Sequence, residues 1–191
     1  MTPLLEQVGQ YLPLDSYEAQ MARRLQRFLE TADPIAVFSR DLAGNAPEWG
    51  HVTGSAWVVN RSFSRVVLLH HGKLNIWVQP GGHCDGESNV LGVAGREATE
   101  ETGLHVTPHN TRIFDIDVHR IPEYSGTPAH LHFDVRYIFV ADENQTVVCS
   151  HESKAVRWMT LEEAEELSGE ESIARMIRKT RSLQHIAPTS F

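Results

Sequence analysis

The chain has 191 residues, enough for one domain with a sizeable core or one domain with a helical extension. Its 17 Lys and Arg against 25 Asp and Glu give a formal net charge of −8, which argues against the cationic surface that nucleic-acid binding requires. No stretch approaches the roughly 20 apolar residues that cross a bilayer, and the N-terminus lacks a basic start followed by an apolar run. We therefore expect a cytoplasmic protein that binds neither nucleic acid nor a membrane, with Cys84 and Cys149 as reduced thiols.

The N-terminal part predicts one amphipathic helix over residues 16–31. Asp15 and Glu18 resemble a capping box at its start. Apolar side chains follow at helical spacing, namely Tyr17, Met21, Leu25, Phe28 and Leu29. Because this apolar face must be buried, the helix has to pack on another element. The segment from residue 33 to about residue 50 is predicted to be a connecting loop.

The middle of the chain predicts strands that lead into a second helix. Two β-branched and apolar runs, 51–60 and 64–70, are joined by a polar turn and predict a hairpin. A short strand over 74–79 leads into a glycine-rich loop. The second helix is predicted over 89–102, with Gly103 as its C-terminal stop.

The second half of the chain predicts further strands and two helices. Strands are expected over 111–121 and 130–140, and another extended piece over 155–159. A capping box at Thr160 opens a helix that ends at Gly169, and a final helix follows it. This order predicts an α/β fold in which helices cover the faces of a mixed sheet.

Three glutamates lie at helical spacings of three and four in the predicted helix 89–102, namely Glu97, Glu100 and Glu101. Like charges at these spacings repel each other and destabilise a helix. A hard divalent cation such as Mg²⁺ takes oxygen ligands and leaves positions open for phosphate, so a bound cation would remove the repulsion. The alternative is an ordinary solvated helix face.

A longer pattern surrounds these glutamates. Gly82 is followed, after thirteen residues, by the run Arg96-Glu97-Ala98-Thr99-Glu100-Glu101-Thr102-Gly103-Leu104. The segment resembles the signature of the Nudix hydrolases. It departs from that signature at one point, because the first glutamate of the family pattern would fall at Ser88, whereas Glu87 lies one place earlier.

The resemblance implies a fold and a reaction class. The fold would be an α/β/α sandwich with a mixed sheet, preceded here by an N-terminal helical extension. We expect the extension and loop over residues 1–50 and a Nudix hydrolase domain over 51–191. The activity would be metal-dependent cleavage of a pyrophosphate bond in a small phosphate-containing substrate. That substrate would be a nucleoside diphosphate linked to another group, such as a nucleotide sugar, an ADP-ribose-like compound or a nucleoside triphosphate.

The resemblance also implies roles for particular residues. The metal ligands, for Mg²⁺ or Mn²⁺, would be Glu97, Glu100, Glu101, the backbone carbonyl of Gly82 and Glu87. Arg96 would orient the carboxylates through charge-assisted hydrogen bonds. The general base would be Glu100 or Glu101, or Glu152 from a later loop, for which an ordinary surface glutamate is the alternative.

The predicted strand 130–140 alternates apolar with polar residues, and the polar positions are His130, His132, Asp134 and Arg136. We expect this polar face to line a substrate cleft, with His130, His132 and Arg136 as substrate-binding residues. For the two histidines, which could also bind a metal or a phosphate, the alternative is an ordinary half-exposed pair. Trp77, just before the glycine-rich loop, is expected either in the core or stacked on a base.

Two other function classes stay open. A Nudix-fold module can bind a nucleotide or partner without turnover, although none of the three glutamates is lost here. An isoprenoid-diphosphate isomerase shares the fold and can carry a cysteine near the metal. The sequence names neither the substrate nor the oligomeric state, which is a monomer or a homodimer.

Overall fold

The structure is a computed structural model, and it describes residues 3–40, 43, 48–72, 75–123, 126–151 and 153–184. The chain divides into two compact units. Unit 1 comprises Met1–Ser55, Gly81–Ala94 and Thr111–Tyr137, and unit 2 comprises Ala56–Pro80, Gly95–Asn110 and Ile138–Phe191. Three elements contribute residues to both units, namely strand β1 (Gly50–Val59), helix α3 (Val90–Thr102) and strand β7 (His130–Val140).

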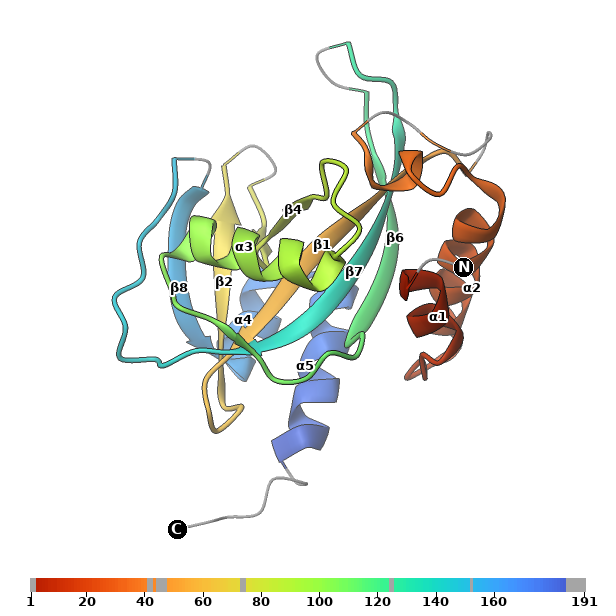
Figure 1. Cartoon of the computed structure of the whole chain (residues 1–191). Helices are drawn as coiled ribbons and strands as arrows, with labels where there is room; N and C mark the ends of the chain where they lie inside the picture. The colour runs from red at the N-terminus through yellow and green to blue at the C-terminus, as the bar shows by residue number, and fades with distance from the viewer. Residues whose placement is uncertain are drawn as a thin grey trace. The chain divides into compact units, whose positions relative to one another are not determined.

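Unit 1 combines the N-terminal helices with antiparallel strands. Its complete elements are α1 (Pro3–Gly9), α2 (Ser16–Thr31), the 3-10 helix η1 (Ala36–Phe38), β4 (Gly81–His83) and β6 (Asp115–Ile121). Strand β4 pairs with the first half of β1, and β6 pairs with β7 along its whole length. Helix α2 packs against β6, and α1 packs against α2 (Figure 1).

Helix α2 has the predicted bounds, and its predicted apolar face is buried except at Tyr17, which lies in the first turn and is 52% exposed. The side chain of Asp15 accepts a hydrogen bond from the Glu18 amide at 2.8 Å, which caps the helix. The Glu18 carboxylate accepts hydrogen bonds from the Leu14 amide at 2.6 Å and from the Tyr11 hydroxyl. Phe28 stacks on Phe133 of β7 with ring centroids 4.0 Å apart. The helix is therefore an integral part of the core of unit 1.

Unit 2 is built around strand β2. Its complete elements are β2 (Arg65–His71), β3 (Trp77–Val78), β5 (Thr107–Pro108), β8 (Ser153–Thr160), α4 (Leu161–Ser168) and α5 (Glu171–Gln184). Strand β2 pairs antiparallel with the end of β1, with β3 and, over its whole length, with β8. Trp57 is fully buried, and its indole donates a hydrogen bond to the Thr180 hydroxyl of α5 at 2.8 Å. This contact attaches the last helix to the end of β1.

Most predicted elements are confirmed. The hairpin of β1 and β2, helix α3 and strand β7 lie where the sequence places them. Helix α4 starts at the predicted capping box, in which Thr160 and Glu163 bond each other's backbone, and Gly169 follows it in the left-handed conformation with φ +66°. The predicted α/β class with a mixed sheet is also confirmed. No helix within the described ranges has the length and apolar character needed to cross a bilayer.

Some elements differ from the prediction. Strand β3 is limited to two residues, and residues 111–114 precede β6 without strand structure. Helix α1 was not predicted. The glycine-rich segment Gly81–His83 is a strand because its backbone pairs with residues 53–55 of β1. A Cβ at Gly81 would lie 2.2 Å from the oxygen of the Ser55 hydroxyl. Glycine at this position therefore allows the two strands to approach each other closely.

The burial of α2 makes a prediction about stability. Phe28→Ala removes a side chain that is 2% exposed and stacked on Phe133, so we expect it to lower the free energy of unfolding by about 3–5 kcal/mol. Tyr17→Ala on the same helix, where Tyr17 is 52% exposed, is the matched control and should have little effect. Urea denaturation measures both. Equal small losses would show that α2 does not contribute to the core.

Candidate functional site

Helix α3 carries the predicted glutamates and is capped at both ends. At its start the Asn89 side chain accepts a hydrogen bond from the Gly92 amide at 3.2 Å. At its end Gly103 is left-handed, with φ +69°, and its amide donates to the Thr99 carbonyl at 2.9 Å. Both caps agree with the predicted helix, so the spacing of its glutamates is that of a regular α-helix.

Small residues let α3 lie close to its neighbours in each unit. In unit 1, a Cβ at Gly54 of β1 would lie 2.9 Å from the carbonyl oxygen of Val90. In unit 2, a Cβ at Gly95 would lie 3.1 Å from the ring of Phe139, and Ala98 is fully buried. The side of α3 that holds Gly95 and Ala98 is packed against other residues. The charged residues therefore lie on the other side of the helix.

The charged side of α3 holds Arg96 between glutamates. The Arg96 guanidinium lies 3.3 Å from the Glu97 carboxylate and 4.0 Å from that of Glu100. The Glu97 side chain is 19% exposed and that of Glu100 is 62% exposed, while Glu101 is half-buried. Arg96 therefore contacts two of the three carboxylates, and its role in orienting them as metal ligands stays a prediction. Screened pairs of this kind contribute little to stability, about 0–1 kcal/mol.

Gly82 and Glu87 lie before the helix, in unit 1. Gly82 is in β4, with Gly54 of β1 as its pairing partner. Glu87 is exposed and follows a tight turn in which Asp85 and Gly86 have φ of +50° and +90°. Its amide donates to the Cys84 carbonyl at 2.9 Å. Glu87 is thus held by the turn that connects β4 to α3.

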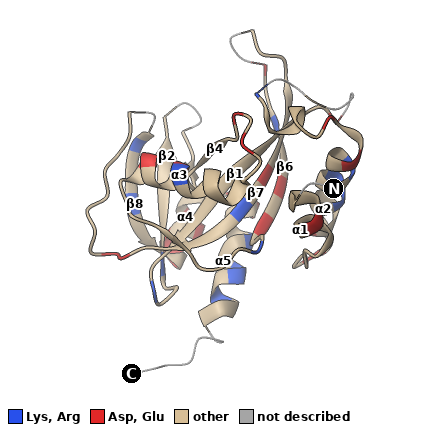
Figure 2. Cartoon of the chain, viewed as in Figure 1, with Lys and Arg blue, Asp and Glu red and all other residues tan. Residues whose placement is uncertain are grey.

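The polar face of unit 1 is set by the register of β6 and β7. Asp115 lies opposite Arg136, Asp117 opposite Asp134, and His119 opposite His132. Figure 2 shows acidic positions on β6 beside a basic position on β7. Because side chains two residues apart on a strand share a face, this register gathers the charged residues at one end and the histidines at the other.

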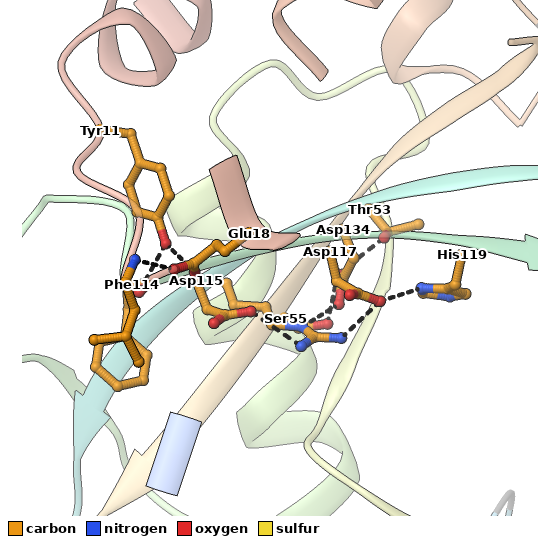
Figure 3. A network of polar contacts seen from close by, with 11 residues as sticks. Tyr11, Glu18, Thr53, Ser55, Phe114, Asp115, Asp117, His119 and Asp134 are labelled. Carbon is orange, nitrogen blue, oxygen red and sulfur yellow. Dashed lines mark hydrogen bonds and ion pairs between the residues drawn. The ribbon is translucent and has the colours of Figure 1, made fainter. Parts of the chain in front are cut away.

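Arg136 is the centre of the charged group. Its Nε lies 2.7 Å from Asp134, its Nη1 3.1 Å from Asp115 and its Nη2 3.6 Å from Asp117. Asp134 also accepts hydrogen bonds from the hydroxyls of Thr53 at 3.0 Å and Ser55 at 2.8 Å (Figure 3). Burial lowers the pKa of Arg136, but the three carboxylates outweigh it and raise that pKa above its usual value. The guanidinium is therefore permanently charged and neutralises part of the surrounding negative charge.

Five histidines form the other group. The ring centroids of His51 lie 4.8–4.9 Å from those of His83, His130 and His132, and His119 lies 5.5 Å from His132. Burial, followed by the neighbouring histidines, lowers the pKa of His51 to about 3. Burial likewise lowers the pKa values of His83 and His132. These three rings are therefore neutral near pH 7.

Comparison with known families decides the assignment of the chain. A family model described as NUDIX domain matches residues 50–180, which is more than half of the sequence. The chain belongs to the Nudix family. This finding confirms the resemblance seen around Arg96 and the glutamates.

Solved structures with the same fold include other members of the family. An Ap4A hydrolase of C. elegans, in a binary complex, is 18% identical, with 71% of this Nudix chain and 98% of that chain covered and a TM-score of 0.57. A Nudix-family hydrolase of Clostridium perfringens is 22% identical, with 70% and 97% covered and a TM-score of 0.52. The Nudix hydrolase RenU of M. smegmatis is 20% identical, with 74% and 89% covered and a TM-score of 0.53. At these identities the similarity shows the fold alone. None of the curated proteins matches the chain.

The predicted substrate-binding residues of this Nudix protein lie in two different settings. His130 and His132 belong to the histidine group, in which His130 is buried, with 6% of its surface exposed, and His132 is half-buried. Arg136 is 3% exposed and held by three carboxylates, and this burial argues against direct contact with a substrate. Its part in substrate binding stays a prediction. Glu152, the alternative base, lies outside the described residues.

Trp77 is half-buried and has two partners in unit 2. Its ring stacks on that of His70 with centroids 5.0 Å apart, and the Arg157 guanidinium lies 4.9 Å from its centroid. Stacking of Trp77 on a base stays a prediction, and it would compete with these contacts.

Sequence reasoning did not single out His51 and His83. His51 shares one side of β1 with Thr53, and His83 is the pairing partner of Thr53. The signal in the sequence was the alternation of His51, Thr53 and Ser55 with apolar residues. That alternation places His51 on a polar face, but only the strand register brings His83 beside it.

The Arg136 group predicts a large loss of stability on mutation. Arg136→Leu would remove the guanidinium that pairs with the buried carboxylates of Asp115 and Asp134, so we expect the free energy of unfolding to fall by about 3–5 kcal/mol. Arg120→Leu on the same antiparallel pair of strands is the control, because Arg120 is exposed on β6. Urea denaturation at pH 7 measures both. A loss no larger than that of Arg120→Leu would show that the ion pairs are not needed for folding.

Proposed function

We propose that the protein hydrolyses a pyrophosphate bond in a nucleoside diphosphate linked to another group, using Mg²⁺ or Mn²⁺. The observation that carries this proposal is the charged side of α3, where Arg96 contacts Glu97 and Glu100, and Glu101 lies one turn from Glu97. Membership of the Nudix family supports pyrophosphohydrolase activity as the reaction class.

The donor chemistry of α3 suits a hard divalent cation, although in the described part of the chain the three carboxylates do not lie at the mutual spacing of a shared metal site. Carboxylate oxygens are the ligands that Mg²⁺ and Mn²⁺ prefer, and the partial exposure of Glu97, Glu100 and Glu101 leaves them accessible to a cation. When bound, the cation neutralises phosphate oxygens and lowers the pKa of a bound water. Gly82 and Glu87 are the further ligands proposed from the family pattern.

The remaining steps are assigned to side chains of the protein. Arg96 holds the carboxylates of Glu97 and Glu100 in position through its ion pairs. Glu100 or Glu101 accepts the proton of the attacking water, which requires a carboxylate within hydrogen-bond reach of that water. Glu152 is the competing candidate for this role.

The test is a product-release assay with Mg²⁺ and then with Mn²⁺. The panel contains ADP-ribose, nucleotide sugars, nucleoside triphosphates and isopentenyl diphosphate. It also contains dinucleoside polyphosphates, because one structure with the same fold is described as an Ap4A hydrolase. We expect metal-dependent cleavage of at least one member. Isomerised isopentenyl diphosphate would identify an isomerase instead. Substrate binding without release of product would favour a binding module.

Substitutions on α3 test the site itself. Glu100→Gln and Glu101→Gln remove charge without removing volume, so we expect kcat to fall at least about 100-fold while the melting temperature changes little. Glu166→Gln on α4 is the matched control, because Glu166 is also an exposed helical glutamate. Full activity in both α3 variants would overturn the site assignment. A collapse of kcat in Glu152→Gln alone would assign the proton transfer to Glu152.

A further inference from the structure

Three histidines from three strands of unit 1 bring their ring nitrogens together. His51 is in β1, His83 in β4 and His132 in β7, and one nitrogen of each lies within 4.8 Å of one nitrogen of the other two. Among the described residues this is the group of His, Cys, Asp or Glu side chains whose spacing suits a shared metal ion. The three glutamates of α3 do not form such a group in the described part of the chain.

Three of the six ring nitrogens in this cluster are buried without a hydrogen-bond partner. His51 is 2% exposed, yet both of its ring nitrogens are buried without a partner, and so is Nε2 of His132. These are three of the seven buried, unpartnered side-chain atoms found within the described ranges. Because buried polar atoms are nearly always paired, such a concentration at one point indicates that these nitrogens bind a ligand.

The two neighbouring histidines, His130 and His119, have ordinary hydrogen-bond partners for their rings. Nδ1 of His130 lies 2.7 Å from the Pro128 carbonyl oxygen, and Nδ1 of His119 lies 3.2 Å from the Asp117 carboxylate. Each of these two rings therefore has a conventional partner. A purely structural role for His51 would require a similar partner, which the described residues do not supply.

The chemistry of the cluster selects a class of ion. Neutral imidazoles bind Zn²⁺ and similar first-row transition ions well, whereas Mg²⁺ prefers oxygen ligands. Three histidines with one open position are also an arrangement in which zinc keeps a site for water. We propose that His51, His83 and His132 bind one zinc-class divalent ion and that the glutamates of α3 take no part in this site.

The test is metal binding by the whole chain, without reference to hydrolysis. Metal-free protein is titrated with Zn²⁺ and with Co²⁺ while excess Mg²⁺ is present, and Co²⁺ coordination is followed by visible absorption. We expect one equivalent to bind, and X-ray absorption of the zinc form to show nitrogen ligands at about 2.0–2.1 Å. Failure to bind either ion, or a zinc shell made of oxygen alone, would overturn the proposal.

Variants identify the ligands. We use His83→Gln because His83 is only half-buried and its loss threatens folding less than that of His51. We expect the affinity for Zn²⁺ to fall more than about 100-fold, beyond the effect of removing an outer hydrogen-bond partner. His105→Gln, at an exposed position in unit 2, and Glu101→Gln should both bind as the wild type does. Unchanged affinity in His83→Gln, or its loss in Glu101→Gln, would place the ion elsewhere.

Discussion

The ion pairs of Arg136 are the constraint on which the polar face of unit 1 depends. The register of β6 and β7 sets Asp117 directly opposite Asp134, with Asp115 one step along, and three buried carboxylates at this spacing would repel one another. Arg136 contacts all three, so its charge makes this register tolerable. A shift of one residue would turn the aspartates and histidines toward the apolar face. The arrangement that sets His119 opposite His132 is therefore maintained by the same contacts.

The protein presents two sets of metal-type donors with different chemistry. The glutamates of α3 offer oxygen, are partly exposed, and lie beside Arg96, so their chemistry suits a hard cation. The histidines of unit 1 offer nitrogen, His51 is buried and His83 and His132 are half-buried, and burial lowers the pKa of each ring, so they suit a softer ion. Because the donors differ in both softness and exposure, each set would favour a different ion from the same solution.

The N-terminal residues extend unit 1 beyond the segment that the family model matches. That match begins at residue 50, yet α2 buries Phe28 against β7 and packs along β6. Glu18 of α2 is fully buried and accepts hydrogen bonds from Leu14 and Tyr11, which fixes the turn before the helix. The helix thus covers strands that carry the Arg136 group. Since loops and added helices often set specificity in shared folds, this segment is where differences from other family members are expected.

The sequence alone determined the local structure and the glutamate pattern. Capping residues such as Asp15, Thr160 and Gly103 fixed helix ends, and the period-two alternation of residues 130–140 fixed β7, because these signals act between residues close in the chain. The spacing of Glu97, Glu100 and Glu101 likewise follows from a regular helix. Only the tertiary structure decided that Arg136 is buried among carboxylates and that His51, His83 and His132 meet. Those residues come from separate strands, and the hydrogen-bonded register that brings them together cannot be read from any one segment.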